Sequence, residues 1–386
     1  MTMERFDVAV IGCGAMGAAA LWRLAARGAT VIGFDRFAPP HDRGSSHGES
    51  RIIRTAYFEG PAYVPLAQRS FQLWRELEAE SDASLLTVTG ALMIGRPASV
   101  VVAGALASAE AHGLAHERLD HAAMARRYPR HRLGADEIAI YEADAGFLRP
   151  EAGVGAALRR AEALGATVRR DTPVDAIEPA PDGASVRVTA GGVTYEARHA
   201  VVAAGSWLGA LLPQLRLPLR VERQAVAWFP LDDPAPYDPS RFPVFIRELP
   251  SGRSHYGFPT LDGATIKFAV HHEGATTTAD GIDRTVHDDD LAPLYAYAGS
   301  YLRGVEARVV RSQVCMYTDT PDDHFIIGAP PGLPALTILG GGSGHAYKFA
   351  PVIGDIAADL ALTGHTDYPI DLFAPGRFAG RAGVSL

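Results

Sequence analysis

The sequence has few cysteines and no long apolar or basic segment. Cys13 and Cys315 are the only cysteines among 386 residues, which excludes a disulfide framework and fits a reducing compartment such as the cytoplasm. No apolar run approaches the length of a membrane span, and the first predicted strand begins too close to Met1 to leave room for a secretory signal. With a net charge of −8 and no basic tract, the chain is not expected to bind nucleic acid. We therefore expect a cytoplasmic protein without a membrane or nucleic-acid partner.

The remaining composition is typical of a soluble globular protein. Hydrophobic residues make up 47% of the chain and charged residues 21%, far from the composition of disordered chains. The length of 386 residues suits about two domains, at roughly 150 residues each. The chain is therefore long enough to bury a sizeable core.

The stretch from Phe6 to Asp35 predicts a βαβ unit. It reads FDVAVIGCGAMGAAALWRLAARGATVIGFD. An apolar strand, Val8 to Ile11, leads into three spaced glycines and a helix rich in Ala and Leu, and a second strand ends at Asp35. Strand, glycines, helix, second strand and acid thus occur in the order of a dinucleotide-binding unit.

Each part of this unit has a physical role in holding a dinucleotide. Gly12 permits the tight turn, Gly14 lets the backbone approach a pyrophosphate, and Gly17 lets the helix pack on the strand. The helix N-terminus offers free N–H groups to the phosphates, and Asp35 would accept hydrogen bonds from ribose hydroxyls, which favours FAD or NAD over NADP. The alternative is a glycine-rich turn of some other α/β domain, and the unit alone does not choose between FAD and NAD.

The rest of the chain alternates between two kinds of pattern. Helices and buried strands like those of the opening unit return twice, once with a strand that ends near Gly205. A strand bent at Gly90 and a later strand-rich series are typical of a second, mixed or antiparallel sheet. We predict an α/β fold in which a Rossmann-type nucleotide-binding domain (1–84, 150–218 and 320–386) is interleaved with a substrate domain (85–149 and 219–319).

Two later segments are candidates for the chemistry. The loop from Gly340 to Lys348 lies between a predicted strand and a predicted helix, which places a second positive helix end where the N1 and C2=O edge of a flavin needs one. Its alternative is a glycine-rich turn used for packing. Cys315 lies among apolar neighbours, where a thiol is more often a buried core residue than a reactive one.

Three basic residues have a pattern that leaves their placement open. In the strand pattern TIKFAV, period two puts Lys267 on one face with His271, and a solvated face is the commoner outcome for lysine. Arg51 and Arg54 follow a His/Gly/Ser loop. Three residues apart, they would share one face of a helical turn and clamp a carboxylate, although surface arginines are as common.

Motifs spread over almost the whole chain carry a family resemblance. In chain order they are FDVAVIGCGAMG, PPHDRGSSHGESRIIR, EGPAYVPLAQRS, YEADAGFLRPE, YGFPT followed by IKFAVHHEG, CMYTDTPDDHFIIG and GGSGHAYKFAPVIGDIAADLALTG. Together they resemble the monomeric sarcosine oxidase and N-methyltryptophan oxidase group of FAD-dependent amine oxidases. The resemblance implies that the nucleotide is FAD.

The resemblance also implies roles for individual residues. Cys315 matches the position at which the family bonds covalently to the flavin, and Lys267 matches a lysine near flavin N5 that helps to activate dioxygen. Arg54 and Lys348 match residues that hold the substrate carboxylate. Other residues expected around flavin and substrate are His47, Arg51, Tyr256, His271 and Tyr317. The expected FAD-binding residues, besides Cys315 and Lys348, are Gly12, Gly14, Ala15, Met16, Gly17, Asp35, Arg36, Ser50, Gly205, Gly342 and Gly344. No metal is expected.

Two segments depart from the family pattern. In the loop where family members often show His-His-Gly-Asp-Thr-Arg, this chain has Ser46 in place of an imidazole, while Ser50 keeps a hydroxyl. Near the C-terminus, Ala346 and Tyr347 stand where Gly and Phe are usual. We expect altered hydrogen bonding in the first segment and a reshaped pocket entrance in the second.

The activity implied by the resemblance is that of an FAD-dependent oxidase acting on the CH–NH group of a secondary amino acid. The imine product hydrolyses, and dioxygen reoxidises the flavin to give hydrogen peroxide. The alternatives are a dehydrogenase that uses another electron acceptor and a flavin-binding protein without turnover, with an NAD-dependent dehydrogenase remote. Sarcosine, a bulkier N-methyl amino acid and a cyclic imino acid such as pipecolate all remain open as substrates, and the family name suggests a monomer.

Overall fold

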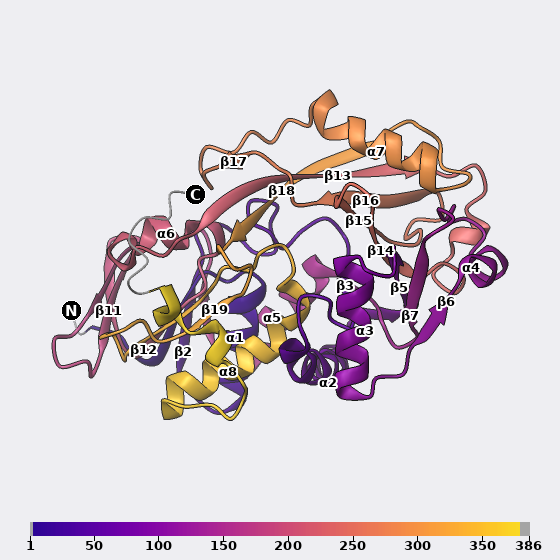
Figure 1. Cartoon of the computed structure of the whole chain (residues 1–386). Coiled ribbons are helices and arrows are strands. Elements are labelled where there is room, and N and C mark those ends of the chain that lie inside the picture. Colours follow the sequence, from indigo (N-terminus) through magenta and orange to yellow (C-terminus); the bar gives the residue numbers. More distant parts are fainter. Residues whose placement is uncertain (1–2, 379–386) are drawn as a thin grey trace.

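The computed structural model describes residues 3–378, and two large sheets organise them (Figure 1). One sheet has eight strands, the other has nine, and a third, small sheet has three. The chain passes back and forth between the large sheets, which confirms the predicted α/β fold with an interleaved mixed sheet. Residues 379–386, the end of the last segment assigned to the nucleotide-binding domain, lie outside the described residues.

The eight-stranded sheet has a parallel centre. Its strands are β1 (Arg5–Ile11), β2 (Val31–Phe34), β9 (Thr167–Arg169), β10 (Val174–Pro179), β11 (Val186–Ala190), β12 (Val193–Val202), β19 (Ile326–Gly328) and β20 (Leu336–Gly340). β20, β12, β1, β2 and β9 pair in parallel in that order. The hairpin of β10 and β11 continues onto the first half of β12, and β19 pairs antiparallel with β20.

The strands of this sheet place apolar side chains on both faces, and helices cover one of them. Val8 and Val10 of β1 pack with the helices, whereas Ala9 and Ile11 join a separate core that includes the β11 hairpin. The helices of the molecule are α1 (Ala15–Ala26), α2 (Val64–Ser81), α3 (Val100–His112), α4 (His121–Arg127), α5 (Pro150–Ala163), α6 (Leu208–Leu211), α7 (Asp288–Tyr301) and α8 (Ala350–Thr363). Among the described residues, no helix combines the length and the apolar character that a membrane crossing needs.

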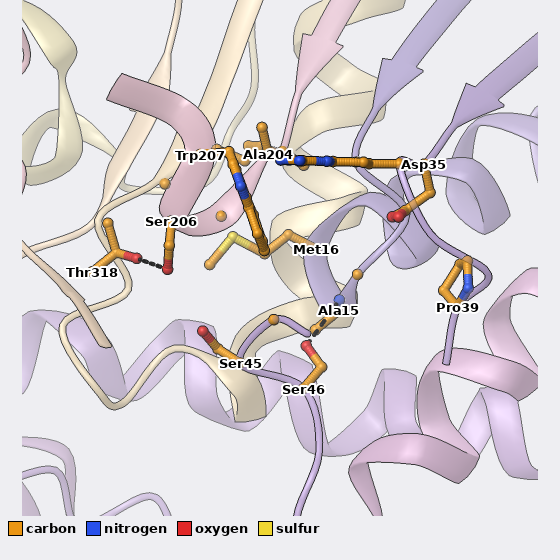
Figure 2. Close-up of a pocket in the computed structure, with 18 of the residues that line it drawn as sticks. Ala15, Met16, Asp35, Pro39, Ser45, Ser46, Ala204, Ser206, Trp207 and Thr318 are labelled. Carbon is orange, nitrogen blue, oxygen red and sulfur yellow. Dashed lines mark hydrogen bonds between the residues drawn. The ribbon is translucent and has the colours of Figure 1, made fainter. Parts of the chain in front are cut away.

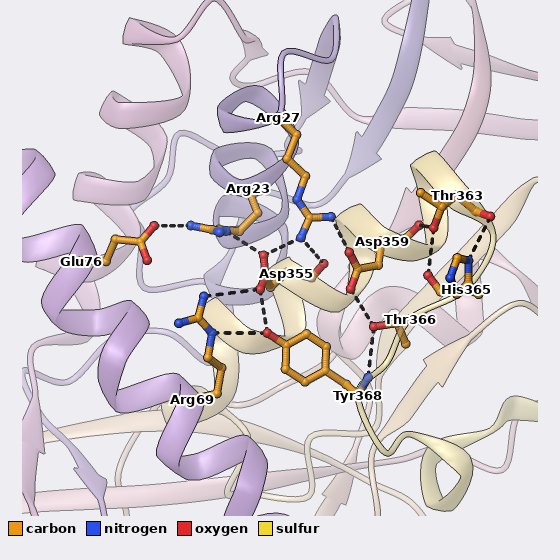
Figure 3. Close-up of polar contacts among 10 residues, drawn as sticks. All are labelled: Arg23, Arg27, Arg69, Glu76, Asp355, Asp359, Thr363, His365, Thr366 and Tyr368. Carbon is orange, nitrogen blue, oxygen red and sulfur yellow. Dashed lines mark hydrogen bonds and ion pairs between the residues drawn. The ribbon is translucent and has the colours of Figure 1, made fainter.

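Ion pairs hold α1 against its neighbours. Arg23 of α1 and Arg27, the residue after α1, both contact Asp355 of α8, and Arg23 also pairs with Glu76 of α2 (Figure 3). The hydroxyl of Tyr368 donates to the same aspartate at 2.7 Å. Burial raises the pKa of Asp355, but this hydroxyl and the two arginines outweigh it and lower the pKa. The network fixes the orientation of α1, whose N-terminus faces the cleft described below.

The nine-stranded sheet brings distant segments to one place. Its strands are β5 (Ala91–Gly95), β6 (Glu117–Leu119), β7 (Ile138–Glu142), β13 (Arg220–Pro230), β14 (Val244–Glu248), β15 (Ser254–Gly257), β16 (Thr265–His271), β17 (Thr276–Thr277) and β18 (Arg311–Asp319). The long strand β13 pairs with β16 at one edge and with β18 at the other. In this register Trp228 lies opposite both Lys267 and Arg311, while Gln224 lies opposite Cys315.

The prediction of one strand bent at Gly90 in the second sheet is wrong for the segment 85–94. It forms β4 (Leu86–Val88) and β5, and only β5 joins the nine-stranded sheet. Between them Gly90 has a φ of +75°, and the backbone N–H groups of Thr89 and Gly90 both donate to the carbonyl of Ala145. The turn diverts the chain before β4 and β5 can form one strand.

The helical turn predicted for Arg51 and Arg54 is also wrong. Arg51 begins β3 (Arg51–Ile53), which pairs with β8 (Gly146–Leu148), and β4 completes the three-stranded sheet. Ile52 and Ile53 are β-branched residues that favour a strand. The two arginines therefore come to the site from a strand and its following loop, not from one helix face.

Candidate active site

A large cleft opens at the carboxyl ends of the parallel strands (Figure 2). Its volume is about 660 Å³, and it is lined by the turn after β1, the ends of β2 and β20, and the loop from Pro39 to Ser46. Figure 2 shows the side chains of Met16, Asp35 and Trp207 around it. Ligands of open α/β sheets bind at this edge, so the cleft is the candidate nucleotide site.

The glycines of the first turn differ in what they contact. A Cβ on Gly12, whose φ is +89°, would lie 2.5 Å from the carbonyl oxygen of Ala203. A Cβ on Gly17 would lie 1.7 Å from the carbonyl oxygen of Gly12, so both positions require glycine for backbone packing. A Cβ on Gly14 would meet nothing closer than Ser46 Oγ, at 3.8 Å. Gly14 therefore keeps open the approach to the helix, as a phosphate site needs.

Helix α1 begins at the cleft with free N–H groups. No side chain caps it at Gly14, and its first turn has no acidic residue. The backbone N–H of Ala15 donates to Ser46 Oγ at 3.3 Å, so Ser46 contacts this helix end (Figure 2). The remaining N–H groups and the positive end of the helix dipole favour an anion.

Asp35 lies at the cleft but is partly engaged by the backbone. Its carboxylate accepts hydrogen bonds from the N–H groups of Cys13, at 2.7 Å, and Phe37, at 2.9 Å. These bonds tie the glycine-containing turn after β1 to the end of β2. Arg36, the next residue, lines the same cleft and pairs with Asp280 at 2.7 Å.

A smaller cavity of about 70 Å³ adjoins the cleft. Arg51, Tyr317, Gly344 and Tyr347 line both spaces, so the two are continuous at these residues. Its walls combine a few cations with apolar and aromatic side chains, which is typical of a small-molecule site. The other lining residues are His47, Ile52, Arg54, Phe58, Glu59, Gln224, Val226, Ile246, Tyr256, Phe258, His271, Cys315, His345 and Lys348.

Two buried cations face this cavity around a carboxylate. Arg54 donates to Glu59 at 2.6 Å, and Lys348 donates to the carbonyl of His345 at 2.7 Å and to Tyr57 Oη at 3.3 Å. Burial raises the pKa of Glu59, but Arg54, His345 and Lys348 bring it down to about 2. Arg54 and Lys348 thus stabilise the ionised form of a carboxylate at this edge of the cavity.

Cys315 lies where the cleft and the small cavity meet. Its Sγ is 3.7 Å from Arg51 Nη2, and the thiol is buried. Burial raises the pKa of this thiol, but His47 and Arg51 outweigh it and lower the pKa to about 7. A large fraction of the cysteine is then thiolate near neutral pH, the reactive form.

Lys267 is buried, which overturns the solvated face favoured by its residue type. It is 3% exposed, and Nζ donates to the carbonyl oxygens of Gly48, at 2.6 Å, and Ser50, at 3.0 Å. Burial lowers its pKa well below the usual value, and the neighbouring Arg51 lowers it further.

The aromatic residues of the small cavity are held neutral. Burial lowers the pKa of His271 well below its usual value, and His272 adds to the effect. Burial raises the pKa values of Tyr256 and Tyr317. These side chains therefore act as neutral hydrogen-bonding groups around the cations at neutral pH.

The sequence comparison decides which family this architecture represents. The family described as FAD dependent oxidoreductase matches residues 7–360. The chain belongs to this family. FAD is therefore its cofactor.

Individual members of the FAD-dependent oxidoreductase family match the chain end to end. A monomeric sarcosine oxidase of Streptomyces avermitilis is 44% identical over 97% of this chain and 98% of its own length. An N-methyl-L-tryptophan oxidase of Salmonella heidelberg is 34% identical over 97% of this chain and 100% of its own. The solved structure of NikD, an unusual amino acid oxidase essential for nikkomycin biosynthesis, has a TM-score of 0.85 at 26% identity and covers 96% of this chain and 98% of that one.

The residues of the cleft fit FAD. The turn and helix end at Gly12 to Ala15 suit a pyrophosphate, as shown above. At the other end of the cleft, Gly344 has a φ of +73°, and a Cβ there would lie 2.5 Å from the ring of Tyr317. Helix α8 follows after a 3₁₀ turn, Tyr347–Phe349, and no side chain caps its N-terminus. A second helix end thus points toward the space that a flavin ring needs.

The structure brings most of the predicted site residues together. Three of them line neither space: Gly17 packs under the turn, while Lys267 donates to the carbonyl of Ser50, the residue before β3. Lining the large cleft are Gly12, Gly14, Ala15, Met16, Asp35, Arg36, Arg51, Gly205, Tyr317, Gly342 and Gly344. Lining the small cavity are His47, Arg51, Arg54, Tyr256, His271, Cys315, Tyr317, Gly344 and Lys348.

Sequence reasoning missed several residues that the site uses. Glu59 is the ion-pair partner of Arg54, and its position five residues later in the same loop was a usable signal. Gln224 lines the cavity from β13 and Phe258 from the residue after β15, and neither carried a signal of its own. Their contribution depends on strand register, which the local sequence does not reveal.

An ionic cluster lies behind Tyr317. Single ligand atoms of Glu222, His272 and Asp319 come within 4.8 Å of one another, a spacing that metal sites also show. The carboxylate of Glu222, however, already accepts hydrogen bonds from Arg220, Gln224 and the N–H of Gly274. These donors satisfy the charge from within the chain.

Proposed function

We propose that this member of the FAD-dependent oxidoreductase family is an oxidase of small secondary amino acids. The observation that carries the proposal is the pair of buried cations, Arg54 and Lys348, beside a small cavity that opens onto the FAD cleft. When bound, FAD supplies the two-electron acceptor for amine oxidation and, once reduced, the donor for dioxygen. The imine product would hydrolyse, and dioxygen would yield hydrogen peroxide.

The chain's own residues position the substrate. Arg54 and Lys348 would hold its carboxylate, which fixes the amine and its neighbouring C–H bond toward the cleft. Tyr317, which lines both spaces, and the neutral His271 would contact the amine end. The buried walls around them exclude water, which strengthens the attraction between carboxylate and cations.

Lys267 would serve the oxygen step. It is a buried side chain whose Nζ donates hydrogen bonds to two backbone carbonyl oxygens of the loop before β3. A preorganised cation stabilises superoxide as charge develops on oxygen, and it needs no reorganisation to do so.

Cys315 would attach the flavin covalently. Its lowered pKa of about 7 provides a thiolate at the junction of the two spaces. We expect Cys315→Ser protein to lose its yellow colour to the supernatant on acid precipitation, whereas the colour of the parent protein stays in the pellet. Colour that stays with the variant's pellet would contradict attachment through this cysteine. Cys13→Ser is the matched control, because this thiol is buried and its pKa is raised by burial.

The size of the small cavity predicts which substrates the protein oxidises. A cavity of about 70 Å³ holds only a few heavy atoms, and Phe58, Ile246 and Phe258 close it on the apolar side. We expect anaerobic titration to show flavin bleaching by sarcosine, N-methylalanine and pipecolate, with N-methyltryptophan at least about 100-fold less efficient in kcat/KM.

The same titration tests the proposed function. Bleaching by none of these amines would overturn it and would favour a flavin-binding protein without turnover. Under air, one peroxide per substrate consumed distinguishes an oxidase from a dehydrogenase. Equal rates with N-methyltryptophan would instead contradict only the size limit.

We also propose the domain boundaries and the oligomeric state. The segments 1–84, 150–218 and 320–386 would form the FAD-binding domain, and 85–149 with 219–319 the substrate domain. The relative from Streptomyces avermitilis is named monomeric, and we propose a monomer here as well, which sedimentation of the purified holoprotein tests.

A further inference from the structure

Lys267 depends on backbone carbonyls for its position. Lys267 and Lys348 are the only lysines in the sequence, and Lys267 is 3% exposed. Among the described residues it forms no ion pair, and its hydrogen bonds go to the carbonyl oxygens of Gly48 and Ser50. A buried ammonium without a direct carboxylate partner is costly, so the placement of these two oxygens decides how well the charge is held.

The loop that offers the carbonyls has an unusual backbone. Gly48 has a φ of +93° and Glu49 a φ of +69°, so two consecutive residues lie in the left-handed region. That region is unfavourable for a residue such as glutamate, and it persists only where surrounding contacts impose it. On the inner side, the N–H groups of both residues donate to Glu151 Oε1, at 2.6 and 3.2 Å. The bend turns the carbonyls of Gly48 and Ser50 toward one ammonium.

The outer side of the loop is held by a second set of contacts. The Trp228 Nε1–H group donates to one carboxylate oxygen of Glu49 at 3.1 Å, and Arg311 forms an ion pair with the other. The Arg311 guanidinium carbon lies 4.0 Å from the centre of the Trp228 ring, and Lys267 Nζ lies 5.6 Å from it. Strand register explains this arrangement, since Trp228 of β13 is opposite Lys267 on β16 and opposite Arg311 on β18.

We propose that Glu49, gripped by Trp228 and Arg311, is a positioning residue for Lys267. Its side chain pulls the loop outward at the strained residue and so aims the carbonyls of Gly48 and Ser50 at the ammonium. The inference rests on the oxygen-activating role proposed for Lys267, and it extends that role to three residues that touch neither cavity.

The test uses the opposite charges of Glu49 and Arg311. Nearby Glu49, Glu151 and Cys315 raise the pKa of Lys267, against burial and Arg51, which lower it. Glu49→Ala would lower this pKa through either charge or position. Arg311→Met separates the two causes, because removing a cation raises a lysine pKa through space, whereas slackening the loop lowers it.

The experiment reads the lysine directly. With two lysines in the chain, ¹³Cε-lysine labelling of the holoprotein gives two side-chain signals, assigned with Lys348→Met, and their pH titration gives the pKa of Lys267. We expect this pKa to fall in both Glu49→Ala and Arg311→Met. We also expect chemically reduced protein of both variants to be reoxidised by dioxygen about tenfold more slowly. The matched control is Arg308→Met, three residues before Arg311, which removes the exposed ion pair with Glu306. It should leave both readouts unchanged.

Two results would overturn the proposal. A pKa that rises in Arg311→Met would show a through-space charge effect without positioning. An unchanged lysine pKa and reoxidation rate in both variants, with only a lower melting temperature, would show that Glu49 and Arg311 stabilise the fold without positioning Lys267. Neither readout uses an amine substrate, so failure of the proposed amine oxidation appears separately, as absence of bleaching in the parent protein.

Discussion

Lys267→Met is expected to slow the reoxidation of the reduced flavin by dioxygen about 10²- to 10³-fold. The reason is that the variant loses a preorganised charge that acts at the oxygen step, and removal of one such stabilising group has an effect of this size. Reduction by an amine substrate should change only a few-fold, because Arg54 and Lys348, and not Lys267, line the small cavity in which the substrate carboxylate would bind. Stopped-flow mixing of anaerobically reduced protein with oxygenated buffer measures the first rate, and anaerobic mixing with sarcosine measures the second.

The variant keeps the shape of the side chain and removes its charge. Methionine also needs no hydrogen bonds, so Gly48 and Ser50 would lose their donor, and the visible spectrum should be checked for intact flavin binding. Lys267→Arg supplies a second test, since it retains the charge on a larger group and should recover part of the rate. Full oxygen reactivity in Lys267→Met with bound flavin would remove this residue from the oxygen step.

The glycine turn that lines the cleft could be predicted from the sequence because its spacing is a local pattern. Gly12, Gly14 and Gly17 are spaced by the geometry of one turn, and the structure gives each a distinct contact that explains it. The spacing itself belongs to one turn and can be recognised locally, although Gly12 also packs against the carbonyl oxygen of the distant Ala203.

The burial of Lys267 and the reactivity of Cys315 could not be predicted in this way. On residue type alone, the first favoured the surface and the second an inert core. The pairing of β13 with β16 and β18 places Lys267 and Cys315 in one sheet, and Arg51, which comes from β3 of another sheet, affects the pKa values of both. Only the likeness to a family supplied these roles, because the register between strands far apart in the sequence leaves no local pattern.

The helical turn expected at Arg51 and Arg54 failed for a different reason. Spacing by three suggested a shared face, but Ile52 and Ile53 between them favour a strand, and β8 was available to pair with it. The prediction of a clamp used the right residues with the wrong local geometry. Arg54 reaches the cavity from the loop after β3, where Glu59 and Tyr57 hold it.

Arg54→Met is expected to lower kcat/KM for sarcosine about 10²- to 10³-fold, mainly through KM. It removes one of two cations for the substrate carboxylate and leaves the carboxylate of Glu59 buried without its partner, a loss of about 3–4 kcal/mol. Methoxyacetate, which has the carboxylate but no ionisable amine, isolates this effect when its binding is followed by the change in the flavin spectrum. Its dissociation constant should rise by a similar factor in the variant. Arg127→Met is a suitable control, because this partly exposed arginine pairs with Glu117 and lies outside both cavities.

The pH dependence of methoxyacetate binding reports the protonation state of Lys348. Burial and Arg54 hold the pKa of Lys348 at about 7, so this lysine is mostly charged below pH 7 and mostly neutral above it. The dissociation constant in the parent protein should therefore increase as the pH rises through 7. In Arg54→Met the cation that lowers this pKa is gone, so the pKa of Lys348 rises and the weakening of binding should begin at a higher pH. An identical pH profile in the two proteins would contradict a shared carboxylate site, because the two cations could then not be close enough to influence each other.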